Sequence, residues 1–188
     1  MRTAVQRAVL VAAIALALGP RLSHGQPLPL PAQVNLDIDH DGVTDSAVLT
    51  ENPATGAADL AIYLASGGGK PAPARKPTIV KKSLITGLLL RFEGSAAGSL
   101  IVMSGCGGCS NDYATTLTIV YRRGAFWVGG VTYAWDTRYD IGVCDIDFLA
   151  GTGLRSDGLN GRAKPIKGRF RPIRLADWSD ATRPKGCD

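Results

Sequence analysis

Short stretches in which apolar and polar residues alternate recur along this chain, separated by turns rich in glycine and proline. The clearest example is the segment 116–135, where the alternation runs up to a turn at Arg122-Arg123-Gly124 and then resumes. Such alternation is typical of a strand with one buried face, and no long segment has the helical period of about 3.6 residues. The sequence therefore predicts an all-β domain, in the form of an antiparallel sandwich, a twisted sheet or a propeller-blade-like arrangement.

The strands expected from these patterns cover residues 46–50, 60–64, 78–82, 88–92, 100–103 and 144–148. In the last of them Cys144 should point inward and its two acidic neighbours outward, and the glycines that follow at 151 and 153 should end the strand. Gly129-Gly130 interrupts the long hairpin and predicts a bulge. The basic segment 164–174 is expected to be an edge-like strand, because charged edges discourage aggregation. Residues 175–178 are expected to form a short turn or helix.

The first 25 residues have the three parts of a secretory signal peptide. Arg2 and Arg7 give a positive start, Val9–Leu18 is an apolar run, and Ser23-His24-Gly25 offers small residues for cleavage. The apolar run is shorter than the roughly 20 residues that span a membrane. The sequence therefore predicts a signal peptide at residues 1–25, a periplasmic or extracellular location, and no membrane span in the mature chain.

The mature chain should begin near Gln26 with a proline-rich lead-in, residues 26–35, that serves as an extended tether. A single β domain over residues 36–188 is expected to follow. Removing the first 25 residues removes three arginines and no acid, so the formal net charge falls from +5 to +2. A balance this mild does not favour nucleic acid as a partner.

All four cysteines of the sequence, Cys106, Cys109, Cys144 and Cys187, lie in the expected mature chain. An even number of cysteines in an exported protein predicts disulfides, and the favoured pairing is Cys106–Cys109 with Cys144–Cys187. Two alternatives remain open. One is a redox-active Cys-x-x-Cys at 106–109, although glycines rather than a helix N-terminus surround it. The other is a zinc site made by all four cysteines.

The segment 37–45 carries the strongest chemical signal in the sequence. Aspartates stand at every second position from 37 to 41, Gly42 permits a sharp turn with positive φ, and a further aspartate closes the loop at 45. Hard oxygen ligands in this number suit calcium rather than zinc or copper. The predicted calcium ligands are the carboxylates of Asp37, Asp39, Asp41 and Asp45 and the carbonyl oxygen of Val43. The alternative is a plain acidic turn, because Asp and Gly are common in turns.

This loop resembles the calcium loops of dockerins and of integrin-type (FG-GAP or VCBS) repeats. It departs from an EF-hand, which needs a Glu at the twelfth position, where this chain has Val48. The loop leads into LAIYL at residues 60–64, and later a hairpin TLTIVYRRGAFWVGG leads into CDIDFLAGTG. Over residues 36–153 this order is similar to a group of exported bacterial proteins that includes periplasmic inhibitors of lysozyme-like effectors. The resemblance implies the same calcium ligands and assigns no inhibitory residue.

Residues for common catalytic sites are scarce in the expected mature chain. Its one histidine is His40, inside the acidic loop, and its glutamates are Glu51 and Glu93. A Ser–His–Asp triad would have to recruit that histidine. A hydrolase could use aspartates near an aromatic cluster, and the candidates are Asp136, Asp140, Asp145 and Asp147 with Trp127, Tyr133, Trp135 and Tyr139. The same residues are also explained as solvated turns and hydrophobic core, so no catalytic residue is predicted.

The sequence leaves three functions open. The first is a non-catalytic, calcium-stabilised binding module, whose partner would be a periplasmic or secreted protein such as a cell-wall hydrolase. The second is a surface adhesion or glycan-binding module. The third is the aspartate-based hydrolase. We rank them in that order.

Overall fold

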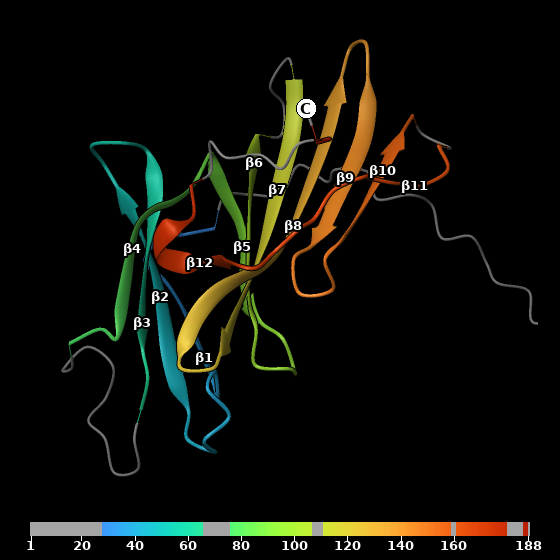
Figure 1. Cartoon of the computed structure of the whole chain (residues 1–188). Coiled ribbons are helices and arrows are strands. Elements are labelled where there is room, and N and C mark those ends of the chain that lie inside the picture. Colours follow the sequence, from blue (N-terminus) through green and yellow to red (C-terminus); the bar gives the residue numbers. More distant parts are fainter. Residues whose placement is uncertain (1–27, 66–75, 107–110, 159–160, 180–185, 188) are drawn as a thin grey trace, which may run out of the picture.

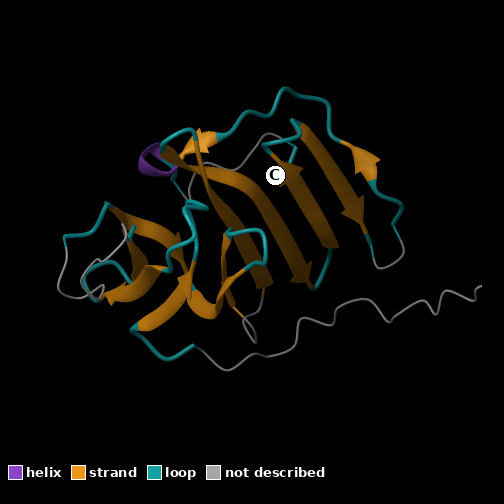
Figure 2. Cartoon of the chain, turned by 90° about the horizontal axis from the view of Figure 1, so that it is seen from below, coloured by secondary structure: helices purple, strands orange, loops and turns teal. Residues whose placement is uncertain are grey.

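A computed structural model describes residues 28–65, 76–106, 111–158, 161–179 and 186–187 of the chain. The predicted signal peptide and the glycine-rich stretch 67–73 lie outside these described residues. The described chain forms two antiparallel sheets and has no α-helix. Figures 1 and 2 show the smaller sheet beside one half of the larger, broad and curved one. The prediction of an all-β fold is confirmed.

The first sheet has four strands in the order β1-β2-β3-β4. They are β1 (Ala32–Leu36), β2 (Asp45–Asn52), β3 (Ala57–Tyr63) and β4 (Ile79–Thr86). The turn between β2 and β3 closes at Asn52, whose carbonyl oxygen accepts the N–H groups of Thr55 and Gly56 at 3.1 and 2.8 Å. Strand β1 forms part of the predicted lead-in and pairs with β2 from Ala32 to Leu36.

The second sheet has eight strands. They are β5 (Leu88–Gly94), β6 (Leu100–Cys106), β7 (Asn111–Arg122), β8 (Ala125–Thr137), β9 (Ile141–Asp147), β10 (Thr152–Asp157), β11 (Lys164–Pro165) and β12 (Ile173–Arg174). Strands β5 to β11 are neighbours in sequence order, and β12 pairs with β8 at Trp127 and Val128, beyond the last pair of β8 with β9. A 3-10 helix, η2 (Leu175–Asp177), follows β12 and agrees with the predicted short turn or helix.

The predicted bulge at Gly129-Gly130 is present. Thr118 pairs with Gly130, and the next residue, Ile119, pairs with Val128, so Gly129 is the extra residue of β8. A Cβ at Gly129 would lie 3.2 Å from Leu149 and 3.3 Å from Val120, which explains the choice of glycine. The bulge reverses the alternation along β8, so Val131 and Trp135 face the core together with Phe126 and Val128.

Three segments differ from the expectations: residues 152–157, the basic segment 164–174 and the lead-in. The strand that contains Cys144 ends at Asp147, before the glycines, as expected, but residues 152–157 then form an unpredicted strand, β10, in a tight hairpin with β9. The basic segment 164–174 is not one strand, because Pro165 and Pro172 lack the N–H that would continue a ladder. It divides into β11 at the sheet edge and β12 against β8.

The lead-in also contributes more than a tether. Leu28 and Leu30 pack against the core, while Pro29 and Pro31 are exposed. Leucine and proline alternate along this extended segment, so the leucines lie on one side of the chain and the prolines on the other. The N–H of Leu28 donates to the carbonyl oxygen of Leu89 in β5 at 2.7 Å, so the lead-in joins the two sheets.

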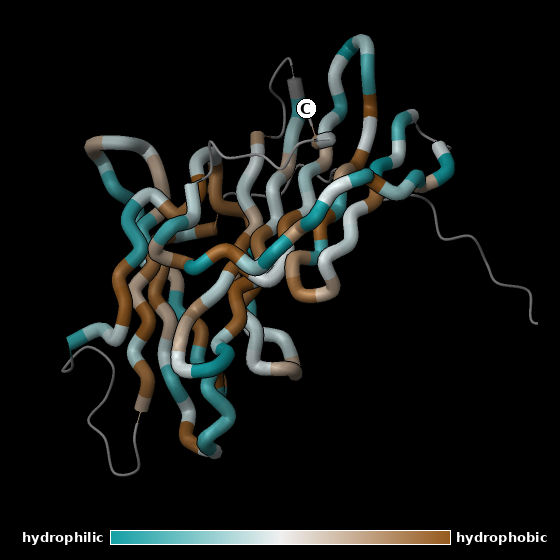
Figure 3. Tube along the Cα trace, viewed as in Figure 1, coloured by the Kyte–Doolittle hydropathy of each residue, from teal (hydrophilic) through white to brown (hydrophobic). Residues whose placement is uncertain are grey.

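One hydrophobic core contains buried residues of both sheets. Figure 3 shows hydrophobic residues concentrated in the strands and hydrophilic ones in the turns and around β11. In β9, Cys144 and Ile146 are buried while Asp145 and Asp147 are exposed, as predicted. The bond between Cys144 and Cys187 is present and ties the end of the chain to the inner face of the second sheet. Cys106 is also disulfide-bonded, and its predicted partner, Cys109, lies outside the described residues.

The segment after β12 connects the two sheets. The indole N–H of Trp178 donates to the carbonyl oxygen of Leu84 in β4 at 3.0 Å, and the Trp178 side chain is buried. The ammonium group of Lys81 donates to the carbonyl oxygen of Ala176 at 3.1 Å. The chain therefore crosses from the second sheet to the outer strand of the first before the described residues end.

Candidate metal site and adjoining groove

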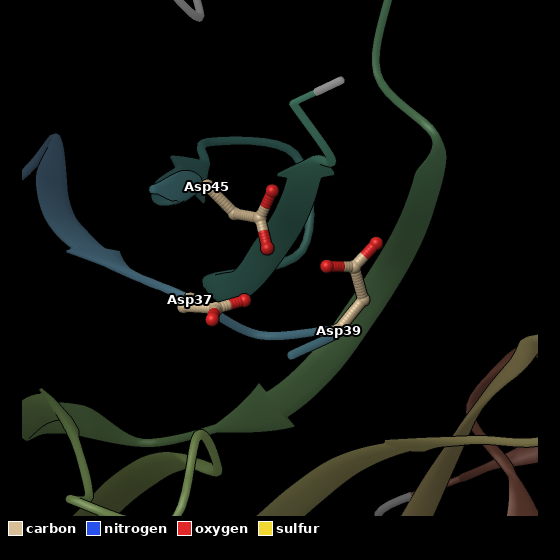
Figure 4. Close-up of side chains that lie close together, drawn as sticks. All are labelled: Asp37, Asp39 and Asp45. Atoms are coloured by element: carbon tan, nitrogen blue, oxygen red, sulfur yellow. The ribbon is translucent and has the colours of Figure 1, made fainter. Parts of the chain in front are cut away.

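Three of the four predicted acidic ligands lie together. Asp37 follows β1, Asp39 lies in the loop and Asp45 begins β2, and one carboxylate oxygen from each lies within 4.8 Å of the others. Figure 4 shows the three carboxylates directed toward a common space. This arrangement arises because β1 and β2 pair directly up to Leu36 and Asp45, which brings the two ends of the loop together.

Asp45 anchors the loop to the core. Its side chain is 1% exposed. One carboxylate oxygen accepts the N–H of Ile38 at 2.8 Å, and the other accepts the N–H of Ala65, after β3, at 2.6 Å. Ile38 is itself a core residue. The carboxylate that closes the predicted loop therefore also joins the loop to two strands of the first sheet.

Backbone N–H groups shape the rest of the loop around the aspartates. Asp37 accepts from the N–H groups of Asp41 and Gly42 at 3.1 and 3.0 Å. Asp41 accepts from the N–H of Val43 at 2.8 Å. Gly42 has a φ of +85°, the left-handed conformation for which glycine was expected at this position. Asp41 is not one of the three clustered acids, so its role and that of the Val43 carbonyl as ligands remain predictions.

The three carboxylates repel one another when no cation is bound. Burial raises the pKa of the Asp39 carboxyl above its ordinary value, and the negative charge of Asp45 raises it further. A bound cation would favour the charged form of each carboxylate and remove this repulsion. The Asp37, Asp39 and Asp45 cluster could therefore hold a metal ion.

A polar groove of about 320 Å³ lies beside this loop. The loop supplies Ile38 and His40, and the turn between β5 and β6 supplies Ala97, Gly98 and Ser99. The remainder come from the end of β7, the middle of β8, the end of β9 and the turn after β9. Its polar side chains are those of His40, Ser99, Thr118, Tyr121, Arg122, Thr132, Asp145 and Asp147. A Cβ at Gly98 would lie 2.5 Å from His40 Cε1, so the glycine lets this turn pack against the loop.

The four aspartates considered for hydrolysis have different surroundings. Asp140 accepts the indole N–H of Trp135 at 2.9 Å, in the turn between β8 and β9. Asp145 accepts the hydroxyl of Thr132 at 2.6 Å. Asp147 accepts the N–H groups of residues 149 and 150 at 2.8 Å each and so caps the turn after β9. Asp136 is exposed in β8. Asp145 and Asp147 line the same groove.

Most of the aromatic cluster is packed. The rings of Tyr133 and Trp135 stack with centroids 5.6 Å apart, and Trp135 is 9% exposed. The guanidinium of Arg155 lies 5.1 Å from the centre of the Trp135 ring, and that of Arg174 lies 4.9 Å from the Trp127 ring. Tyr139, by contrast, is 90% exposed. The cluster therefore contributes mainly to packing.

No protein-family model, curated protein or solved structure matches the chain. Within the described residues, no helix is long and apolar enough to cross a membrane.

Sequence reasoning missed the groove, whose residues come from segments about 100 positions apart. Its one local sign in the sequence is the Gly129-Gly130 bulge, since bulges are common next to functional sites.

Proposed function

We propose that the protein is an exported, non-catalytic binding module stabilised by calcium, and that its partner is a protein such as a cell-wall hydrolase. The observation that carries this proposal is the convergence of Asp37, Asp39 and Asp45 at a loop that Asp45 fixes to the core. A cation at this point would join the loop to the start of β2 and would stabilise the folded state.

Calcium is the cation that best suits these ligands. The donors are carboxylate oxygens, and calcium accepts six to eight hard oxygens in flexible geometry. The Asp41 carboxylate and the Val43 carbonyl, which lie in the same loop, would add to the three clustered acids. Extracellular modules bind calcium at roughly 10⁻⁴–10⁻³ M, and we expect an affinity in this range.

The disulfide between Cys144 and Cys187 supports export, because such bonds persist in oxidising compartments. Together with the predicted signal peptide, it favours the periplasm or the extracellular space. The described cysteines support structural bonds better than a four-cysteine zinc site, since Cys144 and Cys187 are joined to each other.

The surface favours a protein partner over a glycan. Glycan sites commonly present exposed aromatic rings, and most of the rings in the candidate cluster are stacked or covered by arginine. A hydrolase is supported less well, because Asp140 and Asp147 are engaged in turn and ring contacts.

Thermal unfolding of the mature chain, residues 26–188, tests the calcium proposal. At a calcium concentration about 10–100 times the Kd, we expect a stabilisation of about 2 kcal/mol relative to chelator. For a domain of this size that corresponds to a rise in Tm of about 4–8 °C. Asp39→Ala combined with Asp41→Ala should abolish the rise.

The control is Asp136→Ala combined with Asp177→Ala, which removes two exposed acids outside the loop and should leave the rise unchanged. The same melt in calcium and in chelator for the unmodified chain would overturn the calcium assignment.

The partner is tested by inhibition: purified peptidoglycan hydrolases should lose activity in the presence of the protein and calcium. Unchanged activity across such a panel would count against this class of partner.

A further inference from the structure

We infer that the groove beside the acidic loop of residues 37–45 (the metal loop) receives an arginine side chain of the protein partner, between Asp145 and Asp147. This inference deepens the proposed function and rests on its assumption of a protein partner. It starts from the position of the two acids on β9, whose side chains project from the face of the second sheet opposite the core.

The groove has carboxylate oxygens with unused hydrogen-bonding capacity. Asp145 uses one oxygen to accept the Thr132 hydroxyl, and Asp147 uses one to accept two backbone N–H groups. Within the described chain, no protein group donates to the second oxygen of either residue. Each carboxylate is therefore held in place by one oxygen and offers the other to a ligand.

No cation of the described chain neutralises these acids. Its ion pairs join Lys82 to Asp59, Arg91 to Glu93, and Arg155 to Asp157. Arg122 also lines the groove, and it forms no ion pair with either acid. A cationic ligand would therefore meet two uncompensated carboxylates.

Arginine fits this arrangement better than a metal ion or lysine. Its planar guanidinium carries five N–H donors and can bond to carboxylates on two sides. The hydroxyls of Thr118 and Ser99 line the same groove and can accept the remaining donors. A pocket of about 320 Å³ is at the small end of ligand sites and suits one inserted side chain.

Exposed apolar residues surround the acids and point to a protein as the source of the arginine. Leu154 lies opposite Asp145 in the β9–β10 pairing and is 47% exposed. Val143, two residues before Asp145, is 39% exposed, and Leu149 lines the groove at 37% exposed. Exposed apolar side chains beside an acidic groove suit a protein interface, whose hot spots are enriched in arginine.

The metal loop forms one wall of the groove. His40 lies between the predicted ligands Asp39 and Asp41, and Ile38 donates its N–H to Asp45. A cation that orders the loop would therefore also fix the position of this wall. We expect binding in the groove to be stronger in calcium than in chelator.

The experiment is an NMR titration of the isotope-labelled mature chain in calcium, with a tetra-arginine peptide as the probe. The backbone amides of Gly130, Thr132, Asp145 and His40 should shift together. Asp145→Asn combined with Asp147→Asn should raise the Kd about tenfold or more, because charge-assisted hydrogen bonds are lost. The matched control, Asp136→Asn with Asp177→Asn, removes the same charge outside the groove and should change the Kd less than about twofold.

Asn keeps the acceptor oxygens that hold Thr132 and the turn after β9, so the variants should fold. If the double variant melts early, Asp145→Asn alone serves in its place. Equal weakening by the groove and control variants would overturn the inference, since it would show binding to net charge alone. Shifts at these amides with a chito-oligosaccharide and none with tetra-arginine would overturn it in favour of a glycan.

These outcomes are separate from the proposed function. If calcium raises the Tm and a hydrolase is inhibited equally by the unmodified chain and the groove variant, the groove inference fails and the proposed function stands. If tetra-arginine binds in the groove while no hydrolase is inhibited, the groove stands and that class of partner fails.

Discussion

Two buried aspartates in the first sheet, Asp45 and Asp59, have opposite surroundings. Asp45 is 1% exposed, and one of its carboxylate oxygens lies within 4.8 Å of carboxylate oxygens of Asp37 and Asp39. Asp59 is 6% exposed, and its carboxylate lies 2.7 Å from the ammonium group of Lys82. Both carboxylates also accept backbone N–H groups. The sheet therefore compensates one buried charge within the chain and leaves the other among like charges.

The comparison shows why an external cation could suit one of these sites and not the other. Burial would raise the pKa of Asp59, but the hydrogen bonds from Lys82 and from the N–H of Ser83 outweigh it and lower the pKa. At the other site burial and neighbouring acids raise the pKa of Asp39. The same residue type thus closes an internal ion pair in one place and, in the other, belongs to a cluster that could hold a metal ion.

The largest effect is expected from Asp45→Ala. The N–H groups of Ile38 and Ala65 would lose their acceptor inside the core, at a cost of about 2–5 kcal/mol in total. Relief of repulsion with the other acids would offset about 1 kcal/mol at most, because those acids are partly exposed. Chemical denaturation in chelator measures the loss apart from any metal. Asp41→Ala, an exposed change in the same loop, should cost less than about 1 kcal/mol, and equal losses would contradict an anchoring role for Asp45.

Gly98→Ala should have an intermediate effect, on the loop that holds the cluster of three aspartates. The new Cβ would lie 2.5 Å from the His40 ring and 2.9 Å from the Asp37 carbonyl oxygen, at a φ of +72°. We expect a loss of about 1–2 kcal/mol and a smaller rise of Tm in calcium. Gly124→Ala is the matched control, because its φ is +74° and no atom lies within 4 Å of the new Cβ. If both variants respond equally to calcium, the turn does not support the loop.

The smallest effect is expected from Asp59→Asn, and it should depend on pH. Because the folded-state pKa of Asp59 is lowered, its charge stabilises the protein above the unfolded pKa of about 3.9, and this contribution is lost as the pH falls through the folded value. The unmodified chain should exceed the variant by about 1 kcal/mol near neutral pH, and the difference should vanish toward about pH 2. Urea denaturation across pH measures it. Glu93→Gln, which breaks an exposed ion pair, is the control and should change the free energy of unfolding much less. If the stability difference between Asp59→Asn and the unmodified chain is the same at every pH, the role of the ion pair is contradicted.

Asp59 also shows what sequence reasoning could not reach. Its neighbours Ala58 and Leu60 look like an ordinary strand, and nothing nearby marks the residue as special. The pairing of β3 with β4 shifts register between Ala58 and Leu60, and Ser83 opposite adopts a φ of +48°. Asp59 holds that irregular backbone through the N–H of Ser83 at 2.8 Å. The partner lies 24 residues away, so only the folded sheet brings the two together.

Local patterns determined much of this protein. The period-two alternation predicted most strands and the inward position of Cys144, and paired glycines predicted the bulge in β8. The spacing of aspartates and one glycine located the acidic loop, three of whose acids converge. These features are readable because each depends on residues within a few positions of one another, where backbone geometry alone fixes which side chains share a face.

Tertiary structure decided the remainder. The packing of the lead-in leucines, the division of the basic segment into β11 and β12, and the groove beside the metal loop each bring together segments far apart in the chain. Strand pairing also decides which buried aspartate has a compensated charge. It places Lys82 beside Asp59 and other acids beside Asp45. The physical reason is that register and sheet packing, unlike alternation, are set by contacts that no local window of sequence contains.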